Sequence, residues 1–372
     1  MRIIHILPGK ANPERMNGVN KVVHQLASLM QDIPIDVTVV GITKDNDHQT
    51  SARPYDLLLL KGKIRSFHIN NEIKTFIDNL PEKTIIHFHG VLIPLFFSIA
   101  RLLTKRGIPY VITPHGALLK RSMRHNYLLK KIYFNLIEKP HMCRAKAIHA
   151  ITPQEKQAIN QKIPKAPVHV IPNGYPYQLE NDEAILQRNG QIVFGYIGRL
   201  SSNHKGLDQL ITGFNNYFRD YGTGYLWLIG DGPDRHKLVH QANISAAKDH
   251  IIFHGEKHGA EKLALLDKMD VFIHPSRWDV LPTAILEAAA HRKPLLVTQA
   301  TGFGEAIKKW QCGVVIEQGS PTEIAKALEA CHELHQNNQL IPLGKQAEQM
   351  IKQDYNWHNI VRDIISDLYG IK

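Results

Sequence analysis

Two carboxylates near an expected helix start, Asp279 and Glu287 in "SRWDVLPTAILEAAA", have a spacing that could serve a ligand. On one helix, positions eight residues apart would differ by about 80° around the axis and about 12 Å along it. Pro282 favours a first helical turn, so we expect Asp279 in the preceding loop and Glu287 inside the helix. Both would then border free N–H groups that attract an anion, and could accept hydrogen bonds from sugar hydroxyls. The alternative is that Asp279 caps the helix and Glu287 is solvated.

A second pair, Arg199 and Lys205 in "YIGRLSSNHKGLDQLI", could bind a diphosphate. The stretch follows an expected buried strand, and Gly206 opens a helical pattern after it. Arginine offers a planar fork and lysine a point charge, and both suit phosphate oxygens. The spacing G-x-x-x-x-G-K-[ST] is missing, so the stretch is not a P-loop. An ordinary exposed basic loop is the alternative.

Two candidates follow expected strands of the N-terminal half. Gly18, in "MNGV", opens the first expected helix, where a glycine lets a ligand approach the backbone and the helix dipole. The stretch lacks G-x-G-x-x-G, which disfavours a dehydrogenase. His115, in "TPHGAL", directly follows a strand, although a single histidine there is often structural.

These residues require a scaffold in which strands and helices alternate. Short apolar runs alternate with amphipathic stretches such as 19–30 and 91–105, and "IPNGYP" at 171–176 separates two such halves with linker chemistry. The pattern predicts an α/β protein with two doubly wound Rossmann-like domains facing across a cleft, with ligands at the carboxyl ends of the strands. The expected strands are 3–7, 36–40, 84–88, 110–113, 147–151 and 168–171, then 192–196, 226–230, 251–253, 271–274, 295–297 and 314–316.

The positive charge is concentrated in one part of the chain. The net charge is +11, and eleven Lys and Arg face a single acid, Glu138, between positions 101 and 146. Within 116–139 an apolar stripe accompanies the cations, as in a helix that lies on an anionic membrane surface. A core helix with a solvated basic face is the alternative, and no aromatic-basic motif supports nucleic acid. The cations of this predicted membrane and acceptor patch are Lys120, Arg121, Arg124, Lys130 and Lys131.

Composition excludes several other classes. With 372 residues and 43% hydrophobic content, the chain is expected to form two globular domains. Three cysteines without metal spacing favour a reducing cytoplasm, and no apolar run is long enough for a membrane span or signal peptide. "HFH" places His87 and His89 on one face of a strand, but no third ligand stands at a readable spacing. We therefore predict no metal site.

Taken together and in order, these stretches resemble the family-4 retaining glycosyltransferases of the GT-B fold over essentially the whole chain. Each piece is weak alone, and the ordered set is specific. "TPHGAL", the basic stretch and "IHAITPQEK" look like the branch that builds bacterial cell-surface polysaccharides, including lipopolysaccharide. The matching stretches are "MNGV", "TPHGAL", "VIPNG", "GYIGRL…HKG", "LIGDGP", "IIFHG" and "SRWDVLPTAILEAAA".

The resemblance implies transfer of a sugar from a nucleotide diphosphate sugar, of UDP or GDP type, to an acceptor hydroxyl, with retained configuration and without metal or other cofactor. Arg199 and Lys205 match the pair that stabilises the leaving diphosphate, and Glu287 matches the acid that holds the ribose. His115 matches the histidine beside the transferred sugar, and Gly18 a glycine near the diphosphate. The remaining donor contacts would come from Leu281, Pro282 and Thr283 at the phosphates or sugar, and from Gly255, Glu256 and Lys257 at the base.

The sequence departs from the family pattern at Asp279, where the family has Glu, and at Val280, where it has Gly. A side chain one methylene shorter shifts the expected contact with the donor sugar by about 1 Å. The resemblance further implies an acceptor-binding domain at 1–172 with the helix 356–372 packed back on it, and a donor-binding domain at 173–355. We expect a cytoplasmic enzyme, peripheral at the inner face of the membrane, with a lipid-linked saccharide acceptor. The alternatives are a non-catalytic nucleotide-sugar-binding protein, and an epimerase or phosphorylase of the same fold.

Overall fold

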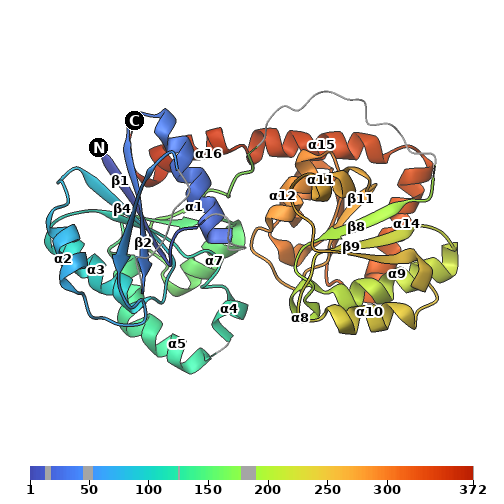
Figure 1. Cartoon of the computed structure of the whole chain (residues 1–372), viewed down its shortest axis with the longest axis horizontal. Helices are drawn as coiled ribbons and strands as arrows, with labels where there is room; N and C mark the ends of the chain where they lie inside the picture. Colours follow the sequence, from blue (N-terminus) through green and yellow to red (C-terminus); the bar gives the residue numbers. More distant parts are fainter. Residues whose placement is uncertain (13–17, 45–52, 125, 177–189, 372) are drawn as a thin grey trace. The chain divides into compact units, whose positions relative to one another are not determined.

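The computed structural model describes residues 1–12, 18–44, 53–124, 126–176 and 190–371. The chain divides into two compact units, Met1–Pro176 with Trp357–Lys372, and Tyr177–Asn356. The predicted boundary at 172/173 lies a few residues before this division, and the end of the chain belongs to the first unit. Each unit is an open parallel sheet flanked by helices (Figure 1), so the predicted α/β class is confirmed.

The first unit is built on a seven-stranded sheet in the order β3-β2-β1-β4-β5-β6-β7, with parallel neighbours throughout. The order reverses between β1 and β4, which makes this the switch point where doubly wound folds bind ligands. The strands are β1 (Arg2–Pro8), β2 (Asp36–Thr43), β3 (Asp56–Lys61), β4 (Thr84–His89), β5 (Tyr110–Thr113), β6 (Ala147–Ala150) and β7 (Val168–Val170).

Residues of β1 alternate between two apolar clusters, because successive side chains of a strand point to opposite faces. Ile4 and Ile6 join the cluster under α2 and α3, whereas Ile3 and Leu7 join the cluster under α1 and α16. The sheet is therefore buried on both faces. The helices are α1 (Gly18–Leu29), η1 (Met30–Asp32), α2 (Asn71–Asp78), α3 (Pro94–Lys105), α4 (Lys120–Arg124), α5 (Tyr127–Tyr133), the π-helix η2 (Phe134–Glu138), α6 (Lys139–Cys143), α7 (Pro153–Lys162), α16 (Trp357–Asp363) and the π-helix η5 (Ile364–Leu368).

The C-terminal segment is part of the first unit's core. Trp357 of α16 is buried in the cluster with α1, and the two helices lie side by side in Figure 1. Gly174 in the "IPNGYP" stretch makes room for it, since a Cβ there would lie 2.7 Å from the Trp357 ring. Because position 174 is a glycine, the chain can pass close to Trp357 of α16 where it leaves the first unit.

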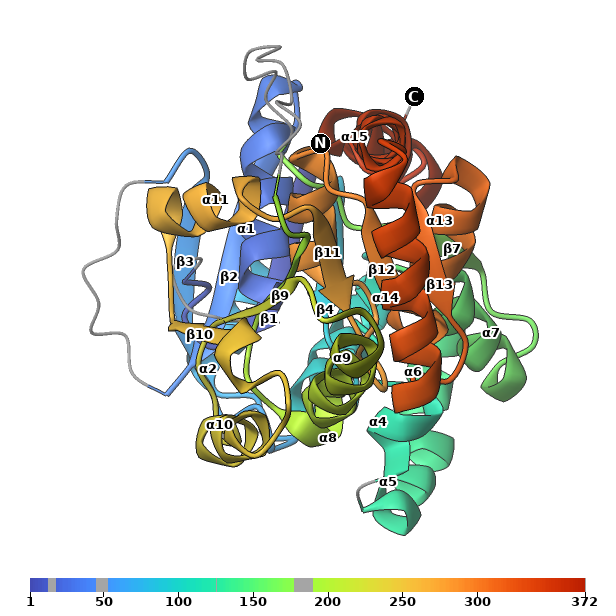
Figure 2. The same cartoon turned by 90° about the vertical axis from the view of Figure 1, so that its right-hand side faces the viewer.

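The second unit repeats the architecture with six parallel strands in the order β10-β9-β8-β11-β12-β13, and its switch point lies between β8 and β11. α9 and α14 run side by side against the sheet (Figure 2), and Leu210, Phe214 and Ile324 share its core. The strands are β8 (Val193–Ile197), β9 (Tyr225–Ile229), β10 (Ile251–Gly255), β11 (Val271–His274), β12 (Leu295–Thr298) and β13 (Gly313–Ile316). The helices are α8 (Ser202–Lys205), α9 (Leu207–Tyr221), α10 (Arg235–Asn243), η3 (Lys248–His250), α11 (Gly259–Asp267), α12 (Thr283–Ala290), η4 (Gln299–Thr301), α13 (Gly304–Trp310), α14 (Pro321–Gln336) and α15 (Leu340–Asp354).

Two features differ from the sequence predictions. The edge strand β3 was not predicted, because its run of four leucines lacks the alternation of a half-buried strand. The expected helix within 116–139 is broken into α4, α5, η2 and α6. Asn126 adopts a left-handed conformation (φ +56°) at the break before α5, and a residue in that conformation cannot continue a right-handed helix. Of the helices described, none is both long and apolar enough to cross a bilayer.

Candidate functional site

The loops after β8 and β11, neighbours at the second switch point, bring Lys205 and Asp279 together. Gly206 ends α8 in a left-handed conformation (φ +67°), and a Cβ there would collide with the carbonyl oxygen of Pro275. Only a glycine allows this close approach. It places the end of α8, with Lys205, directly beside the loop that carries Asp279.

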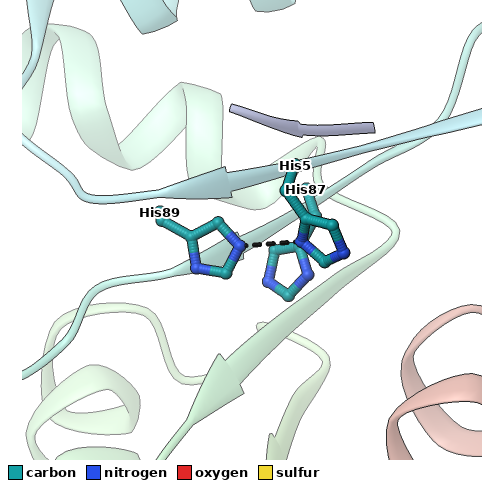
Figure 3. A group of neighbouring side chains, drawn as sticks. All are labelled: His5, His87 and His89. Carbon is teal, nitrogen blue, oxygen red and sulfur yellow. Dashed lines mark hydrogen bonds between the residues drawn. The ribbon is translucent and has the colours of Figure 1, made fainter. Parts of the chain in front are cut away.

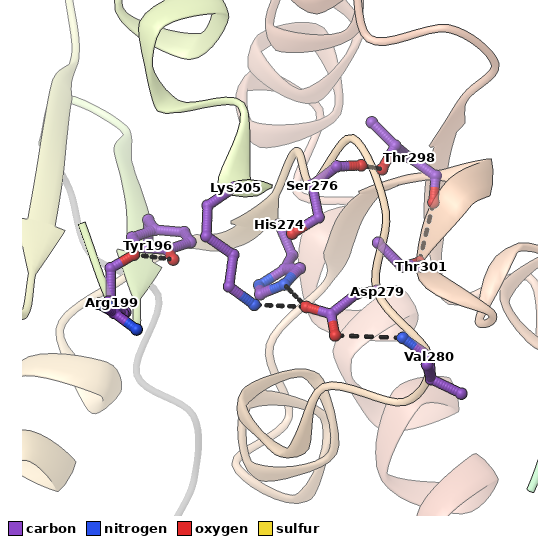
Figure 4. Close-up of polar contacts among 9 residues, drawn as sticks. All are labelled: Tyr196, Arg199, Lys205, His274, Ser276, Asp279, Val280, Thr298 and Thr301. Atoms are coloured by element: carbon purple, nitrogen blue, oxygen red, sulfur yellow. Dashed lines mark hydrogen bonds and ion pairs between the residues drawn. The ribbon is translucent and has the colours of Figure 1, made fainter. Parts of the chain in front are cut away.

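Lys205 and Asp279 form an ion pair, and their side chains point toward one another in Figure 4. The same carboxylate oxygen, Oδ2, accepts a hydrogen bond from Nε2 of His274 at 3.2 Å, and Oδ1 accepts the backbone N–H of Val280 at 3.1 Å. The side chains of Lys205 and Asp279 are only 14% and 17% exposed. An ammonium has three donors, so the ion pair with Asp279 leaves Lys205 capacity for a further anionic partner.

The electrostatics of this group keep Asp279 ionised. Burial alone would raise the pKa of the Asp279 carboxyl, but the His274 hydrogen bond and the Lys205 charge outweigh it and hold that pKa well below its ordinary value. Burial also lowers the pKa of His274, although its bond to Asp279 opposes the shift. The neutral ring donates its Nε2–H, because a carboxylate can only accept.

The loop around Asp279 is fixed by further polar contacts. Arg277 makes a bidentate pair with Asp208 of α9, with both N···O distances at 2.8 Å. The Thr298 hydroxyl donates to the Ser276 carbonyl at 2.5 Å, and the backbone N–H of Asp279 donates to the Ala300 carbonyl at 3.0 Å. Asp279 is thus held at a set position and not on a free loop.

Arg199 follows the same strand end as Lys205 but is exposed and takes no part in the ion pair. Its backbone carbonyl accepts the hydroxyl of Tyr196 at 3.1 Å. Burial, and after it the Asp279 charge, raises the pKa of that buried phenol, which therefore stays a donor. The strand end holds the Arg199 backbone in place while its cationic side chain faces solvent.

Glu287 is paired with Lys262 of α11, with the two side chains 15% and 25% exposed. The alternative that Glu287 is simply solvated is therefore wrong. α12 begins at Thr283, and its N-cap is Pro282, which provides no side-chain hydrogen bond. Asp279 does not cap the helix. The first amides of α12 follow Leu281 and Pro282, so the backbone predicted to meet the donor stands at an uncapped helix start.

The predicted base-contacting residues lie at the end of β10, which is Gly255, and in the turn that follows it. Gly255 adopts φ +71°, and its carbonyl accepts the N–H of Gly230 at 2.8 Å. Lys257 pairs with Glu261 at 3.3 Å, and Glu256 lies 3.3 Å from the ring of His258. Glu256, His258 and Glu261 are more than half exposed and Lys257 is one-third exposed, so both pairs are weak and can be exchanged for a ligand at low cost.

Gly18 and His115 belong to the first unit. Gly18 is the exposed first residue of α1, and a Cβ there would have no described atom within 4 Å. Packing within the described residues thus does not require a glycine at this position. The residues before it, including Met16 and Asn17 of "MNGV", lie outside the described residues.

His115 lies two residues after the end of β5, in a conformation that L-residues rarely adopt, with φ +52°. Such strain persists only where surrounding contacts impose it, and it is concentrated at functional sites. The buried carboxylate of Glu155 supplies one such contact, because it accepts the N–H of Gly116 at 2.5 Å and that of Ile151 at 2.9 Å. A second contact is the 3.1 Å hydrogen bond between His115 Nε2 and Nδ1 of His89.

His5, His87 and His89 form a buried group whose ligand atoms lie within 4.8 Å of one another (Figure 3). Both nitrogens of His87 are engaged, with the Tyr369 hydroxyl at 2.7 Å and the Thr113 hydroxyl at 2.6 Å. Both nitrogens of His89 are engaged as well, with His5 and His115. A metal would have to break these bonds, so the arrangement suits a hydrogen-bonded network better than a ligand set.

The predicted membrane and acceptor patch lies on α4 and α5. Apolar side chains of α5 and η2 are exposed to solvent: Leu128 (72%), Leu129 (71%), Ile132 (58%) and Leu136 (72%). Other side chains of α4 and α5 line a cavity of about 850 Å³. Its lining combines cations with apolar rings and contains no acidic residue among those described: Lys120, Arg121, Arg124, Lys131, Lys162, Met123, Tyr127, Phe134, Asn135 and Gln161.

Comparisons with known families agree with this geometry. Residues 16–178 match Glycosyltransferase Family 4, and residues 178–357 match Glycosyl transferases group 1. The chain belongs to the family-4 glycosyltransferases. It is 24% identical over 354 residues to an uncharacterised glycosyltransferase of Methanocaldococcus jannaschii, covering 94% of this chain and 93% of that protein. It is 21% identical to alpha-maltose-1-phosphate synthase of Mycolicibacterium smegmatis, with 95% of each chain covered.

Solved structures show the same fold. HepE of Anabaena, in complex with UDP, superposes with a TM-score of 0.78 at 17% identity, with 100% of both chains covered. WaaG, a glycosyltransferase involved in lipopolysaccharide biosynthesis, superposes with a TM-score of 0.71 at 14% identity, again with 100% of both chains covered. The predicted GT-B fold of this glycosyltransferase is therefore confirmed.

Sequence reasoning missed several residues of these sites. Lys262 lies in an ordinary helical pattern, and its ion pair with Glu287 depends on how α11 and α12 pack. His5 had a readable signal, because "IIH" of 3–5 repeats at 85–87, and the parallel pairing aligns His5 with His87. The same alignment would have supplied the third histidine of the group around "HFH".

Proposed function

We propose that this glycosyltransferase transfers a sugar from a nucleotide diphosphate sugar, of UDP or GDP type, with retention of configuration and without a metal ion. The observation that carries the proposal is the Lys205–Asp279 ion pair at the second switch point. There a fixed ammonium with remaining donors would meet the diphosphate. Positive charge already in position stabilises a leaving diphosphate, the task that a divalent cation performs in other enzymes.

In this proposal the bond between the anomeric carbon and the diphosphate oxygen breaks, and the acceptor oxygen bonds to that carbon on the same face. The acceptor's proton passes to the departing phosphate oxygen, so charge balances without a further reactant. Lys205 and Arg199 stabilise the diphosphate, Glu287 accepts the ribose hydroxyls, and His115 contacts the transferred sugar. We assign Asp279 mainly to orienting Lys205, since Lys205, His274 and the Val280 N–H already occupy most of its acceptor capacity.

We propose further that the acceptor is a lipid-linked saccharide used in cell-surface polysaccharide synthesis, and that the enzyme works at the inner face of the cell membrane. The support is the exposed apolar side chains of α5, in a segment that also carries cations and lines a cavity offering both charge and apolar contact. Each well-placed cation near an anionic bilayer contributes about 1 kcal/mol at low salt. The involvement of WaaG in lipopolysaccharide biosynthesis fits the same class of acceptor.

The first experiment tests the donor site. UDP- and GDP-sugars are screened by thermal shift and by donor hydrolysis in the presence of EDTA, with parent protein, Lys205→Ala and a matched control, Lys308→Ala. Lys308 lies in an exposed pair with Glu317 in the same unit, outside the proposed donor site. We expect one nucleotide series to stabilise the parent and the control, and loss of Lys205 to reduce hydrolysis about 100-fold or more. Stabilisation without turnover on any acceptor favours a non-catalytic binding protein, and an activity that requires added metal contradicts the proposal.

The second experiment tests the membrane surface by sedimentation with vesicles. The parent should bind vesicles with anionic lipid, and binding should fall steeply with salt. Leu129→Ser with Ile132→Ser, both exposed, should weaken binding without lowering stability. Ile244→Ser, exposed on the second unit, is the matched control. Equal binding to neutral and anionic vesicles would overturn the membrane assignment and leave the donor reaction untouched.

A further inference from the structure

Two hydrogen-bonded chains of histidines cross the first unit beneath His115. One runs from Tyr369 through His87, Thr113 and His149 to the Ile171 carbonyl. The other runs from His5 through His89 to His115. The rings of His87 and His89 stack between the chains, with centroids 4.3 Å apart.

Strand register explains how the chains form. His5 of β1 pairs directly with His87 of β4, and His89 lies two residues further along the same face. His5 Nδ1 and His89 Nε2 are 2.9 Å apart (Figure 3), and His89 Nδ1 reaches His115 Nε2 at 3.1 Å. His89 of β4 thus connects His5 of β1, the neighbouring strand at the switch point, to His115 beyond β5.

All three imidazoles of the second chain are neutral. Burial lowers the pKa of His5 and of His115 to about 3, and lowers that of His89 well below its ordinary value. A neutral imidazole has one N–H donor and one acceptor nitrogen. His89 must therefore donate at one end and accept at the other, so every hydrogen bond of the chain runs in the same direction.

The direction of the first chain follows from its end, because a carbonyl can only accept. His149 therefore donates through Nε2 to Ile171, accepts from Thr113 through Nδ1, and Thr113 in turn accepts from His87 Nε2. His87 Nδ1 then accepts the Tyr369 hydroxyl. Every polar atom along this chain is satisfied.

The second chain ends at His5 Nε2, which is buried without a hydrogen-bond partner among the described residues. If the chain ran from His115 to His5, this nitrogen would be a buried N–H without an acceptor. In the opposite direction it is a bare acceptor, and orphaned buried N–H groups are the rarer of the two. The favoured direction is from His5 to His89 to His115.

We infer that His5 and His89 are positioning residues that fix His115 as its Nδ1–H tautomer, so that His115 presents a hydrogen-bond donor to an oxygen of the substrate. This inference rests on the proposed function for the role of His115, and it specifies the protonation of that residue. His115 Nε2 is occupied by His89. Its Nδ1–H is the group left to serve a sugar hydroxyl or a developing anionic oxygen.

The test reads the tautomer directly by imidazole ¹⁵N shifts of the full-length protein, which needs no turnover. We expect His115 to be Nδ1-protonated in the parent and to show no protonation between pH 5 and 8. His89→Gln keeps a hydrogen-bond donor for His115 and should keep the Nδ1–H tautomer. His89→Leu removes that donor and His5→Leu removes the donor to His89, so in both variants His115 should no longer be held in one tautomer. His141→Phe replaces another buried histidine of this unit and should change nothing. An Nε2-protonated His115 in the parent would overturn the inference.

Kinetics provide a second reading. With a donor and acceptor in hand, His89→Leu should lower kcat about tenfold, the loss of one oriented hydrogen bond, with KM for the donor little changed. His89→Gln should restore most of it, and His141→Phe should match the parent. Absence of transfer by the parent would refute the proposed function alone, because the ¹⁵N result stands without it. A changed kcat with an unchanged His115 tautomer would refute the positioning role.

Discussion

Replacing Asp279 by Asn tests whether charge, and not shape, holds Lys205 at the second switch point. The substitution keeps the size of the side chain and removes the negative charge facing Lys205 and His274. A hydrogen bond to a charged group contributes about 1.5–3 kcal/mol, and partial solvent exposure of the pair places it toward the middle of that range. We therefore expect Asp279→Asn to lower the free energy of unfolding of the second unit by about 2 kcal/mol at pH 7.

The pH dependence gives the prediction its sign. The pKa of Asp279 is depressed in the folded protein, so its contribution is fully present above the ordinary carboxyl pKa of 3.8 and is lost as the pH falls below that value. The difference between parent and Asp279→Asn should therefore be constant from pH 8 to 5 and narrow below about pH 4. A difference that persists unchanged at low pH would point to altered packing and not to the charge.

Tryptophan fluorescence in thermal unfolding suits the measurement, because Trp227, Trp278 and Trp310 lie in the second unit and Trp357 in the first. For a unit of this size, about 2 kcal/mol corresponds to a shift of about 4–8 °C. Glu261→Gln removes the acid of an exposed lysine pair in the same unit and should shift the transition by about 1 °C or less. A shift for Asp279→Asn no larger than that of this control would refute the reasoning.

Three further predictions follow from individual contacts. Burial raises the pKa of the Glu138 carboxyl to about 7, so the stability that its protonated form contributes is lost as the pH rises toward that value. Glu138→Gln should therefore stabilise the first unit at pH 8 and have little effect at pH 5, measured by urea unfolding. Glu287→Ala should weaken UDP or GDP binding about 10- to 100-fold in calorimetry, and the 2′,3′-dideoxy nucleotide should show no such loss. Arg277→Lys breaks the bidentate pair with Asp208 and should destabilise the second unit by about 1–2 kcal/mol, whereas an unchanged stability would mean that the fork is not needed.

The sheets were predictable because their strands are short apolar runs separated by turns. The expected strand 110–113 coincides with β5, and 271–274 coincides with β11. The α4–α5 break was not predictable, because it depends on Asn126 adopting a left-handed conformation within an otherwise helical pattern. Apolar spacing does predict which side chains lie on one face, and Leu128, Ile132 and Leu136 do lie exposed together. Periodicity alone does not tell whether such a face meets a core or solvent.

Site residues that follow strand ends could be predicted from the sequence. The side chains that contact them from other elements could not. Lys205, Asp279 and His115 all follow strand ends, which is the information that a parallel fold provides from sequence. The contact of Lys205 with Asp279 depends on the close approach at Gly206, and that of Glu287 depends on α11. Such tertiary contacts have no local pattern. The contact between His115 and His89 would have required the strand register as well.

The two departures from the family motif, Asp279 and Val280, form a consistent local structure. Val280 is not among the described residues with positive φ, so the loop does not require the glycine that the family has there. Its N–H donates to Oδ1 of Asp279, a short-range contact of the kind that Asp makes with its neighbouring backbone. The other oxygen then faces Lys205 and His274. A shorter acid with an ordinary backbone thus still supplies a fixed charge beside Lys205, and the departure from the family motif does not remove negative charge from the site.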